Sequence, residues 1–195
     1  MPRVRAKEII DTGPRSAHIA GLPYSAFAGT EDIANPKLIF ITPKAGDPND
    51  YVAVKTSAGK IFAITNTCAA NALELTKPGD YAYGNMEASK QAIQPLADHL
   101  GLNVEEAATA ILEKSCQKIM KLIKTLIEEY NLDKSTTSLV GGGGGAAALI
   151  PFTAKRLSMD YRISDNAEVI SSIGVALAMV KDVIERTIVN VTSQD

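Results

Sequence analysis

The sequence has few of the residues that build metal sites and disulfide frameworks. Among its 195 residues there are two cysteines, two histidines and no tryptophan. Cys68 and Cys116 lie far apart and lack the spacing of a metal-binding motif, so we expect neither a zinc site nor a disulfide. The formal net charge of -2 gives no basic face for a nucleic acid.

Long hydrophobic runs are absent as well. The apolar fraction is 46% and the charged fraction 22%, which is typical of a water-soluble globular protein. No stretch approaches the ~20 apolar residues of a membrane-spanning helix, and the charged N-terminus is not followed by the apolar core of a signal peptide. We therefore expect one globular unit in the cytoplasm that binds neither a membrane nor a nucleic acid.

The stretch furthest from average composition is Leu139–Pro151, which contains five consecutive glycines. Residues 137–140 resemble a strand, and residues 146–157 resemble a helix. Glycine has no Cβ, so such a turn can adopt positive φ and let a ligand approach the backbone, while the first amides of the helix favour negative charge. A close-packed connection that binds nothing is the alternative. The predicted nucleotide contacts are Gly141, Gly142, Gly143, Gly144, Gly145 and Ala146.

Three short runs rich in β-forming residues predict an antiparallel meander over residues 37–42, 51–56 and 60–65. Their first connection carries a lysine, a glycine and two aspartates, which suit a phosphate group and its Mg²⁺ ion; a polar loop without a ligand is the alternative. Thr42, Lys44 and Gly46 are predicted nucleotide contacts. Asp47 and Asp50 are predicted metal ligands and catalytic groups.

A Gly-Pro pair near the N-terminus, Gly13 and Pro14, predicts a short helix entered through a tight turn. Asp11, Thr12 and Arg15 surround its start, where they would either hold an anion or cap the helix. Asp11 is a candidate base, and Thr12 and Arg15 are candidate substrate contacts.

Residues 66–71 follow the third strand and contain Asn66, Cys68 and Asn71, three more candidate substrate contacts. The alternatives are that the two asparagines close a turn and that the cysteine is a small buried side chain.

Helices are predicted at 85–100, 103–130 and 168–186, with a short strand at 159–163. Pro95 is expected to bend or restart the first helix. A capping box opens the second, and its apolar residues at spacings of three and four predict one buried stripe as far as Ile127. The last helix carries Val169, Ile173 and Leu177 on one apolar face.

Four segments in this order resemble the hydantoinase/oxoprolinase family, on its hydantoinase A side: Thr12–Pro14, Asn66–Asn71, Leu139–Ala148 and Glu168–Leu177. The similarity covers nearly the whole chain. The family belongs to the actin, sugar-kinase and heat-shock-chaperone ATPase superfamily, and its members use ATP to cleave cyclic amides such as 5-oxoproline.

The resemblance implies an α/β fold, a ribonuclease-H-like (actin-like ATPase) half-domain with a three-stranded meander followed by αβαβα. This half-domain would cover residues 37–195, after an N-terminal segment 1–36 with the Gly-Pro helix. ATP and Mg²⁺ are the implied cofactors, with residues 141–146 at the adenosine and the loop 42–50 at the phosphates.

Two departures from the family pattern lead to a further expectation. The loop 42–50 lacks the Asp-x-Gly-Gly-Thr type sequence, because Thr42 stands near the expected aspartate and Gly46 is the one glycine left. By the same resemblance, we expect this sequence to carry only one of the two halves between which such proteins close ATP. We therefore expect a fragment that does not turn over ATP alone and that pairs with the missing half, on a longer chain or another subunit, or with a second copy.

Two other functions fit parts of the sequence. Gly141-x-Gly143-x-x-Ala146 with Asp160 or Asp165 about 20 residues on matches the fingerprint of an NAD(P)-dependent oxidoreductase. A non-catalytic scaffold would instead use the long helix 103–130 as a partner surface.

Overall fold

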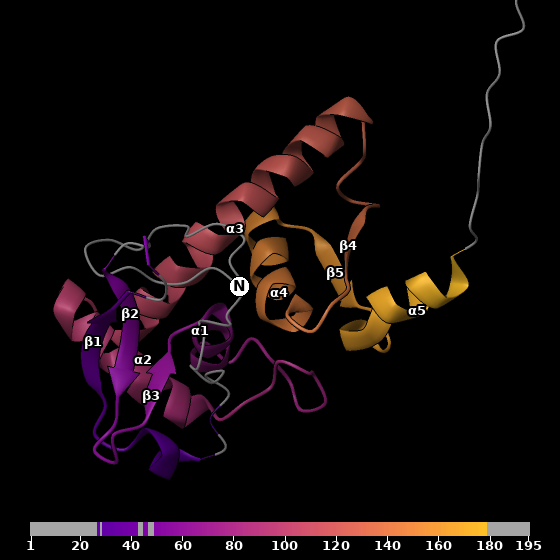
Figure 1. The fold of residues 1–195 in the computed structure, drawn as a ribbon. Helices are drawn as coiled ribbons and strands as arrows, with labels where there is room; N and C mark the ends of the chain where they lie inside the picture. Colours follow the sequence, from indigo (N-terminus) through magenta and orange to yellow (C-terminus); the bar gives the residue numbers. More distant parts are fainter. Residues whose placement is uncertain (1–26, 28, 43–44, 47–48, 179–195) are drawn as a thin grey trace, which may run out of the picture.

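The computed structural model describes residues 27, 29–42, 45–46 and 49–178. In this part of the chain, a three-stranded sheet and a two-stranded sheet flank a central group of helices (Figure 1). The expected mixed α/β class, with an antiparallel meander followed by helices, is confirmed. Five predicted site residues lie outside the described residues: Asp11, Thr12, Arg15, Lys44 and Asp47.

The meander consists of β1 (Lys37–Ile41), β2 (Tyr51–Lys55) and β3 (Ile61–Ala63), in the order β1-β2-β3. Both pairings are antiparallel. The central strand β2 is buried from Tyr51 to Val54. A short 3-10 helix, η1 (Thr30–Ile33), precedes the sheet and places the fully buried Ile33 in the core.

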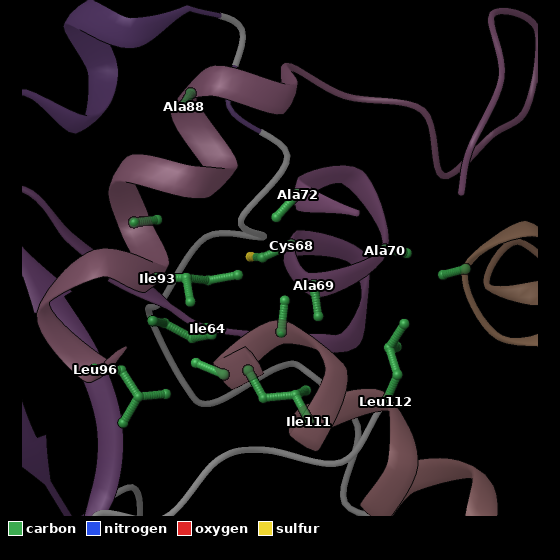
Figure 2. Packing of buried hydrophobic residues seen from close by; sticks show 14 of the residues in the cluster. Ile64, Cys68, Ala69, Ala70, Ala72, Ala88, Ile93, Leu96, Ile111 and Leu112 are labelled. Atoms are coloured by element: carbon green, nitrogen blue, oxygen red, sulfur yellow. The ribbon is translucent and has the colours of Figure 1, made fainter. Parts of the chain in front are cut away.

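Three helices follow: α1 (Asn66–Ala72), α2 (Met86–Leu100) and α3 (Val104–Glu129). Their core combines large and small side chains, since Ile64, Ile93 and Leu112 pack among alanines that are almost fully buried (Figure 2). Each fully buried Leu or Ile contributes about 1.5–3 kcal/mol. The alternative that Asn66 and Asn71 close a turn is wrong, because both lie in the buried helix α1.

The helix α2 is continuous through Pro95, so it does not restart there. Proline inside a helix removes one hydrogen bond and costs ~3 kcal/mol. Ile93 and Leu96, on either side of Pro95, are 0% exposed, so their burial offsets this cost. The helix begins where the Asn85 side chain accepts a bond from the Ala88 amide at 2.8 Å, and it ends at Gly101 in the left-handed conformation.

The predicted capping box at the start of α3 is confirmed by two reciprocal bonds between Asn103 and Glu106, of 2.8 and 2.9 Å. The buried stripe is shorter than predicted: it ends at Cys116, and Leu126 is 48% exposed. The far half of α3 projects beyond the other elements (Figure 1). Apolar residues at helical spacing show which face of α3 is apolar. The described part of the chain covers only the first half of that face.

The C-terminal part contains β4 (Ser138–Gly141), α4 (Ala146–Leu157) and β5 (Asp160–Ile163), with β4 and β5 parallel. After a 3-10 turn, η2 (Ala167–Val169), the helix α5 runs from Ile170 to Leu177. None of the α5 residues is buried among the described residues, so the apolar face expected on this helix is exposed there. No described helix is long and apolar enough to cross a bilayer.

Candidate functional site

The glycine turn, residues 141–145, lies where β4 ends and α4 begins. Because β4 and β5 are parallel, both strands end at the same edge of their sheet, the edge at which α/β proteins bind ligands. Three bonds join the turn to the segment after β5. Ser164 donates to the Gly141 carbonyl from its amide at 2.9 Å and its hydroxyl at 3.0 Å, and the Gly143 amide donates to the Ala167 carbonyl at 2.6 Å.

The glycines of this turn have different physical roles. A Cβ at Gly141 would stand 2.8 Å from Ile150 Cγ1, and one at Gly144 would stand 2.9 Å from Tyr81 Cδ1, so a larger residue at either position would force a neighbouring side chain to move. Gly143 has φ +99°, and a Cβ there would meet nothing within 4 Å. The close-packing alternative therefore accounts for Gly141 and Gly144, whereas Gly143 faces open space.

A hollow of about 260 Å³ opens beside Gly143. Its lining combines the glycine turn, the Tyr81 ring and residues 164–168 after β5. We call it the acidic hollow, because Asp80, Asp165 and Glu168 line it without any cationic side chain.

A second hollow, of about 470 Å³, adjoins the first, and Asp80, Ala147 and Ile163 line both. Lys77 and Arg162 contribute two cations to it, so we call it the basic hollow. The two hollows form one surface between the loop 73–85 and the unit made of α4 and β5.

Hydrogen bonds of the Asn71 side chain hold the loop 73–85 against α1. Its amide nitrogen donates to the carbonyls of Thr67 and Ala82 at 2.8 and 2.9 Å, and its oxygen accepts from the Thr76 hydroxyl at 2.8 Å and the Gly84 amide at 2.7 Å. An asparagine amide has two donor hydrogens and two acceptor lone pairs, and all four are used. Asn71 thus positions the loop and keeps no capacity for the substrate contact predicted from the sequence.

The other two candidates on α1 are also inside the protein. Asn66 is 0% exposed and accepts a bond from the Ser115 hydroxyl at 2.7 Å; its amide nitrogen has no partner among the described residues. Cys68 is 0% exposed, with its sulfur 3.7 Å from the Thr65 hydroxyl. Neither side chain lines the acidic or the basic hollow.

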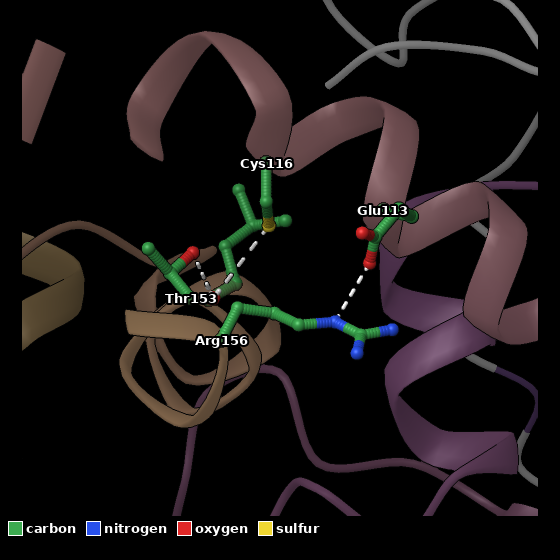
Figure 3. A network of polar contacts seen from close by, with 5 residues as sticks. Glu113, Cys116, Thr153 and Arg156 are labelled. Atoms are coloured by element: carbon green, nitrogen blue, oxygen red, sulfur yellow. Dashed lines mark hydrogen bonds and ion pairs between the residues drawn. The ribbon is translucent and has the colours of Figure 1, made fainter. Parts of the chain in front are cut away.

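Polar contacts also hold α4 against α3 (Figure 3). Arg156 donates to Glu113 at 2.8 Å, and the Cys116 thiol lies 3.9 Å from the Leu149 carbonyl, which also accepts from the Thr153 hydroxyl at 2.8 Å. Burial raises the pKa of the Cys116 thiol, so this cysteine stays protonated and is a poor nucleophile. These contacts fix the helix whose first turn follows Gly143.

The chain matches the family model described as hydantoinase/oxoprolinase over residues 2–183. It belongs to the hydantoinase/oxoprolinase family. The family expected from the four sequence segments is thereby confirmed, and membership indicates a function of the cyclic-amide hydrolase type. Comparisons with curated proteins and with solved structures gave no match.

The hairpin between β1 and β2, which the hydantoinase/oxoprolinase resemblance assigns to phosphate, lies away from the glycine turn. The hairpin begins near Phe40, whose ring lies 5.6 Å from the His99 ring at the C-terminal end of α2. Tyr81, which lies against the glycine turn, precedes the N-terminal end of α2. The 15 residues of α2 span ~22 Å. Thr42 and Gly46 are exposed and Asp50 is half-buried at that far end, and the structure does not bring them together with Gly143.

The residues that line the two hollows and that sequence reasoning missed include Lys77, Asp80, Tyr81, Arg162 and Glu168. Lys77 and Tyr81 belong to the loop between α1 and α2, for which the sequence predicts no site, and Arg162 lies on β5. An aromatic residue in a loop rich in glycine and proline was the available signal. Its position against Gly144 depends on contacts between segments far apart in the chain.

Proposed function

We propose that this chain is the nucleotide-binding part of an ATP-dependent hydrolase of cyclic amides, with the fold of an actin-like, ribonuclease-H-like half-domain. Family membership supports the hydrolase class. The observation that carries nucleotide binding is Gly143, which has positive φ and an open approach at the shared carboxyl edge of β4 and β5. A nucleoside can approach the backbone there more closely than any side chain would allow.

Bound ATP would supply a phosphoryl group that makes the amide carbon of the substrate easier to attack. The residues of this chain would bind and orient it. Asp165 and Glu168 are carboxylates in the acidic hollow that suit the ribose hydroxyls, the partners that acidic residues take at such sites. In the family pattern, Thr42, Lys44 and Gly46 would contact phosphate.

Asp47 and Asp50 would hold Mg²⁺, which prefers one or two carboxylates together with water. The described residues contain no cluster of three or more His, Cys, Asp or Glu side chains fit for a metal, so this site would depend on water and phosphate oxygens. Asp50 is also the catalytic candidate of the hairpin, and Asp11 the candidate base.

The exposed apolar surfaces support an incomplete domain. Leu122 is 65% exposed on α3, and Leu177 is 76% exposed on α5, where the described residues offer no cover. The second half of an actin-like ATPase would supply both the missing protein and the other side of the nucleotide cleft. We therefore expect no steady-state ATP hydrolysis by the isolated chain.

Calorimetric titration with Mg-ATP tests the proposal. We expect wild-type protein to bind ATP or ADP, and Gly143→Leu to abolish binding by filling the approach to the turn. Gly59→Leu is the matched control, since Gly59 also has positive φ, +79°, and open space around it. Both substitutions place a side chain on a backbone with positive φ, which destabilises each variant by ~1–3 kcal/mol. Equal melting temperatures together with unequal ATP binding would therefore show that Gly143→Leu acts on the binding of ATP and not on the fold.

Two results would contradict the proposal: absence of ATP and ADP binding at millimolar concentration, or unchanged binding in Gly143→Leu. NAD is titrated in parallel, because the oxidoreductase alternative would use the same turn and Asp165. Binding of NAD in place of ATP would favour that alternative.

A further inference from the structure

The far half of α3, which projects beyond the other elements, carries an apolar stripe that the described residues leave uncovered (Figure 1). Leu122, Leu126 and Tyr130 follow one another at intervals of four residues, and their side chains are 65%, 48% and 69% exposed. Together with the half-buried Ile119 they lie within about 80° of one another around the helix, because successive residues are about 100° apart. The stripe therefore forms one face that another helix can cover.

Hydrogen bonds of its own chain close the last turn of α3. The Leu132 amide donates to the Ile127 carbonyl at 2.9 Å, across Asn131 in the left-handed conformation. The Asp133 carboxylate then accepts the Ser135 amide at 2.8 Å and the Ser135 hydroxyl at 2.7 Å. A helix end that is fixed in this way presents its side chains in a defined geometry, which lowers the ordering cost of association.

The charges at this end of α3 oppose the helix dipole. Glu128 and Glu129 lie in the last turn, which contains no basic residue, although the C-terminal end of a helix favours cations. Lys118 stands eleven positions before Glu129, about three full turns, so the two exposed side chains project from the same side of α3. They flank the apolar stripe on that side. A cation from another helix, placed beside Glu129, would offset the unfavourable position of its carboxylate.

A second copy of α3 in antiparallel orientation supplies that cation. If Leu122 of one copy opposes Leu126 of the other, Lys118 comes within one residue, ~1.5 Å of helix rise, of Glu129 in the other copy. The two-fold axis repeats every contact, so the apolar pair and the ion pair each occur twice. A parallel arrangement would instead set like charges side by side, which is unfavourable.

We propose that α3 pairs with α3 of a second copy of this chain in an antiparallel contact, with Leu122 against Leu126 and Lys118 beside Glu129. This inference goes beyond the proposed function and does not depend on nucleotide binding. It assigns the exposed face of α3 to the second copy and leaves that of α5 to the missing half of the ATPase. About four turns of helix from each copy bury less than the ~1,600 Å² of a standard interface, so we expect a dissociation constant of roughly 1–100 µM.

Sedimentation equilibrium of the full chain at low salt, over roughly 1–300 µM, tests the contact in the concentration range where such a dimer dissociates. Wild-type protein should show a monomer–dimer equilibrium. Leu122→Glu should weaken it by roughly 100-fold or more, because each copy then sets a carboxylate in the apolar contact. Val175→Glu is the matched control: Val175 is 77% exposed on α5, and the same kind of change there should leave the dissociation constant unchanged.

Charge reversals test the orientation. Glu129→Lys and Lys118→Glu should each weaken the dimer by roughly 2- to 30-fold, the range for two exposed ion pairs. The double variant Lys118→Glu/Glu129→Lys should restore it, because the antiparallel contact sets these two positions beside each other. Glu129→Lys also adds a cation to the C-terminal end of α3, so the melting temperature of the monomer should not fall. Weaker association without a lower melting temperature would separate the contact from the fold.

Several outcomes would overturn the inference. A wild-type monomer at the highest concentration would leave the face of α3 to the missing half of the ATPase. A dimer that persists in Leu122→Glu, or one that Val175→Glu dissociates, would place the contact elsewhere. Single charge reversals without effect, or a double variant that stays weak, would exclude the antiparallel register. None of these results bears on the proposed function, which the titration with Mg-ATP tests separately.

Discussion

Replacing Asn71 by alanine should destabilise the protein by about 3 kcal/mol, because one buried amide makes four hydrogen bonds. A hydrogen bond contributes about 0.5–1.5 kcal/mol net, and a buried group left unpaired costs about 1–3 kcal/mol. The bonds to Ala82 and Thr76 are buried, whereas water can partly replace those to Thr67 and Gly84. The side chain itself is 3% exposed, so alanine would also leave a small cavity.

Urea denaturation followed by circular dichroism gives the free energy of unfolding of each variant. Gln94→Ala is the control, since Gln94 makes one exposed hydrogen bond, to Asp98, and its loss should cost less than about 0.5 kcal/mol. A loss below about 1 kcal/mol in Asn71→Ala would refute the reasoning that this amide holds the loop.

Asn71→Asp sharpens the test through pH. Aspartate keeps the acceptors for Thr76 and Gly84, but it sets a carboxylate against the Thr67 and Ala82 carbonyls. Burial and these carbonyls would raise the aspartate pKa in the folded state above its ordinary ~3.9. The folded state then binds more protons than the unfolded state, so the stability of this variant should fall as pH rises from ~4. Equal stability of Asn71→Asp and wild type at pH 7 would contradict the structure.

Three further predictions concern the helix cap of α3 and the two buried cysteines. Asn103→Ala, which removes one side of the capping box of α3, should lower the free energy of unfolding by ~1 kcal/mol, while Gln117→Ala on the exposed face of α3 should change it little. Both cysteines are 0% exposed and burial raises the pKa of Cys116, so a thiol reagent at pH 8 should label neither quickly until urea is added. Stability linked to Cys116 is complete below the ordinary thiol pKa and falls as pH rises toward the raised value. Rapid native labelling of Cys116 would contradict its burial between α3 and α4.

The features predicted correctly from the sequence are those with local causes. The meander follows from β-forming runs divided by turns, and the start of α3 follows from the reciprocal bonding of Asn103 and Glu106. The predicted helix at residues 146–157 agrees with α4 at both ends. In each case residues a few positions apart determine the backbone conformation.

The errors arose where a distant partner matters. Residues 66–71 form a helix because surrounding core residues bury their small side chains, and α2 continues through Pro95 because Ile93 and Leu96 are buried. The buried stripe predicted for α3 is too long, because periodicity indicates which face is apolar and carries no information on what lies against it.

The candidate site also has some features that the sequence predicts and others that only the tertiary structure determines. The family and the glycine turn can be read from the order of residues along the chain, because a run of glycines between a strand and a helix has a local conformational cause. The tertiary structure alone places Tyr81 against Gly144, joins Lys77 to Arg162 around one hollow, and separates the β1–β2 hairpin from both. These positions depend on how α1, α2 and the loop between them pack, and on four hydrogen bonds from one buried asparagine, none of which spacing in the sequence can specify.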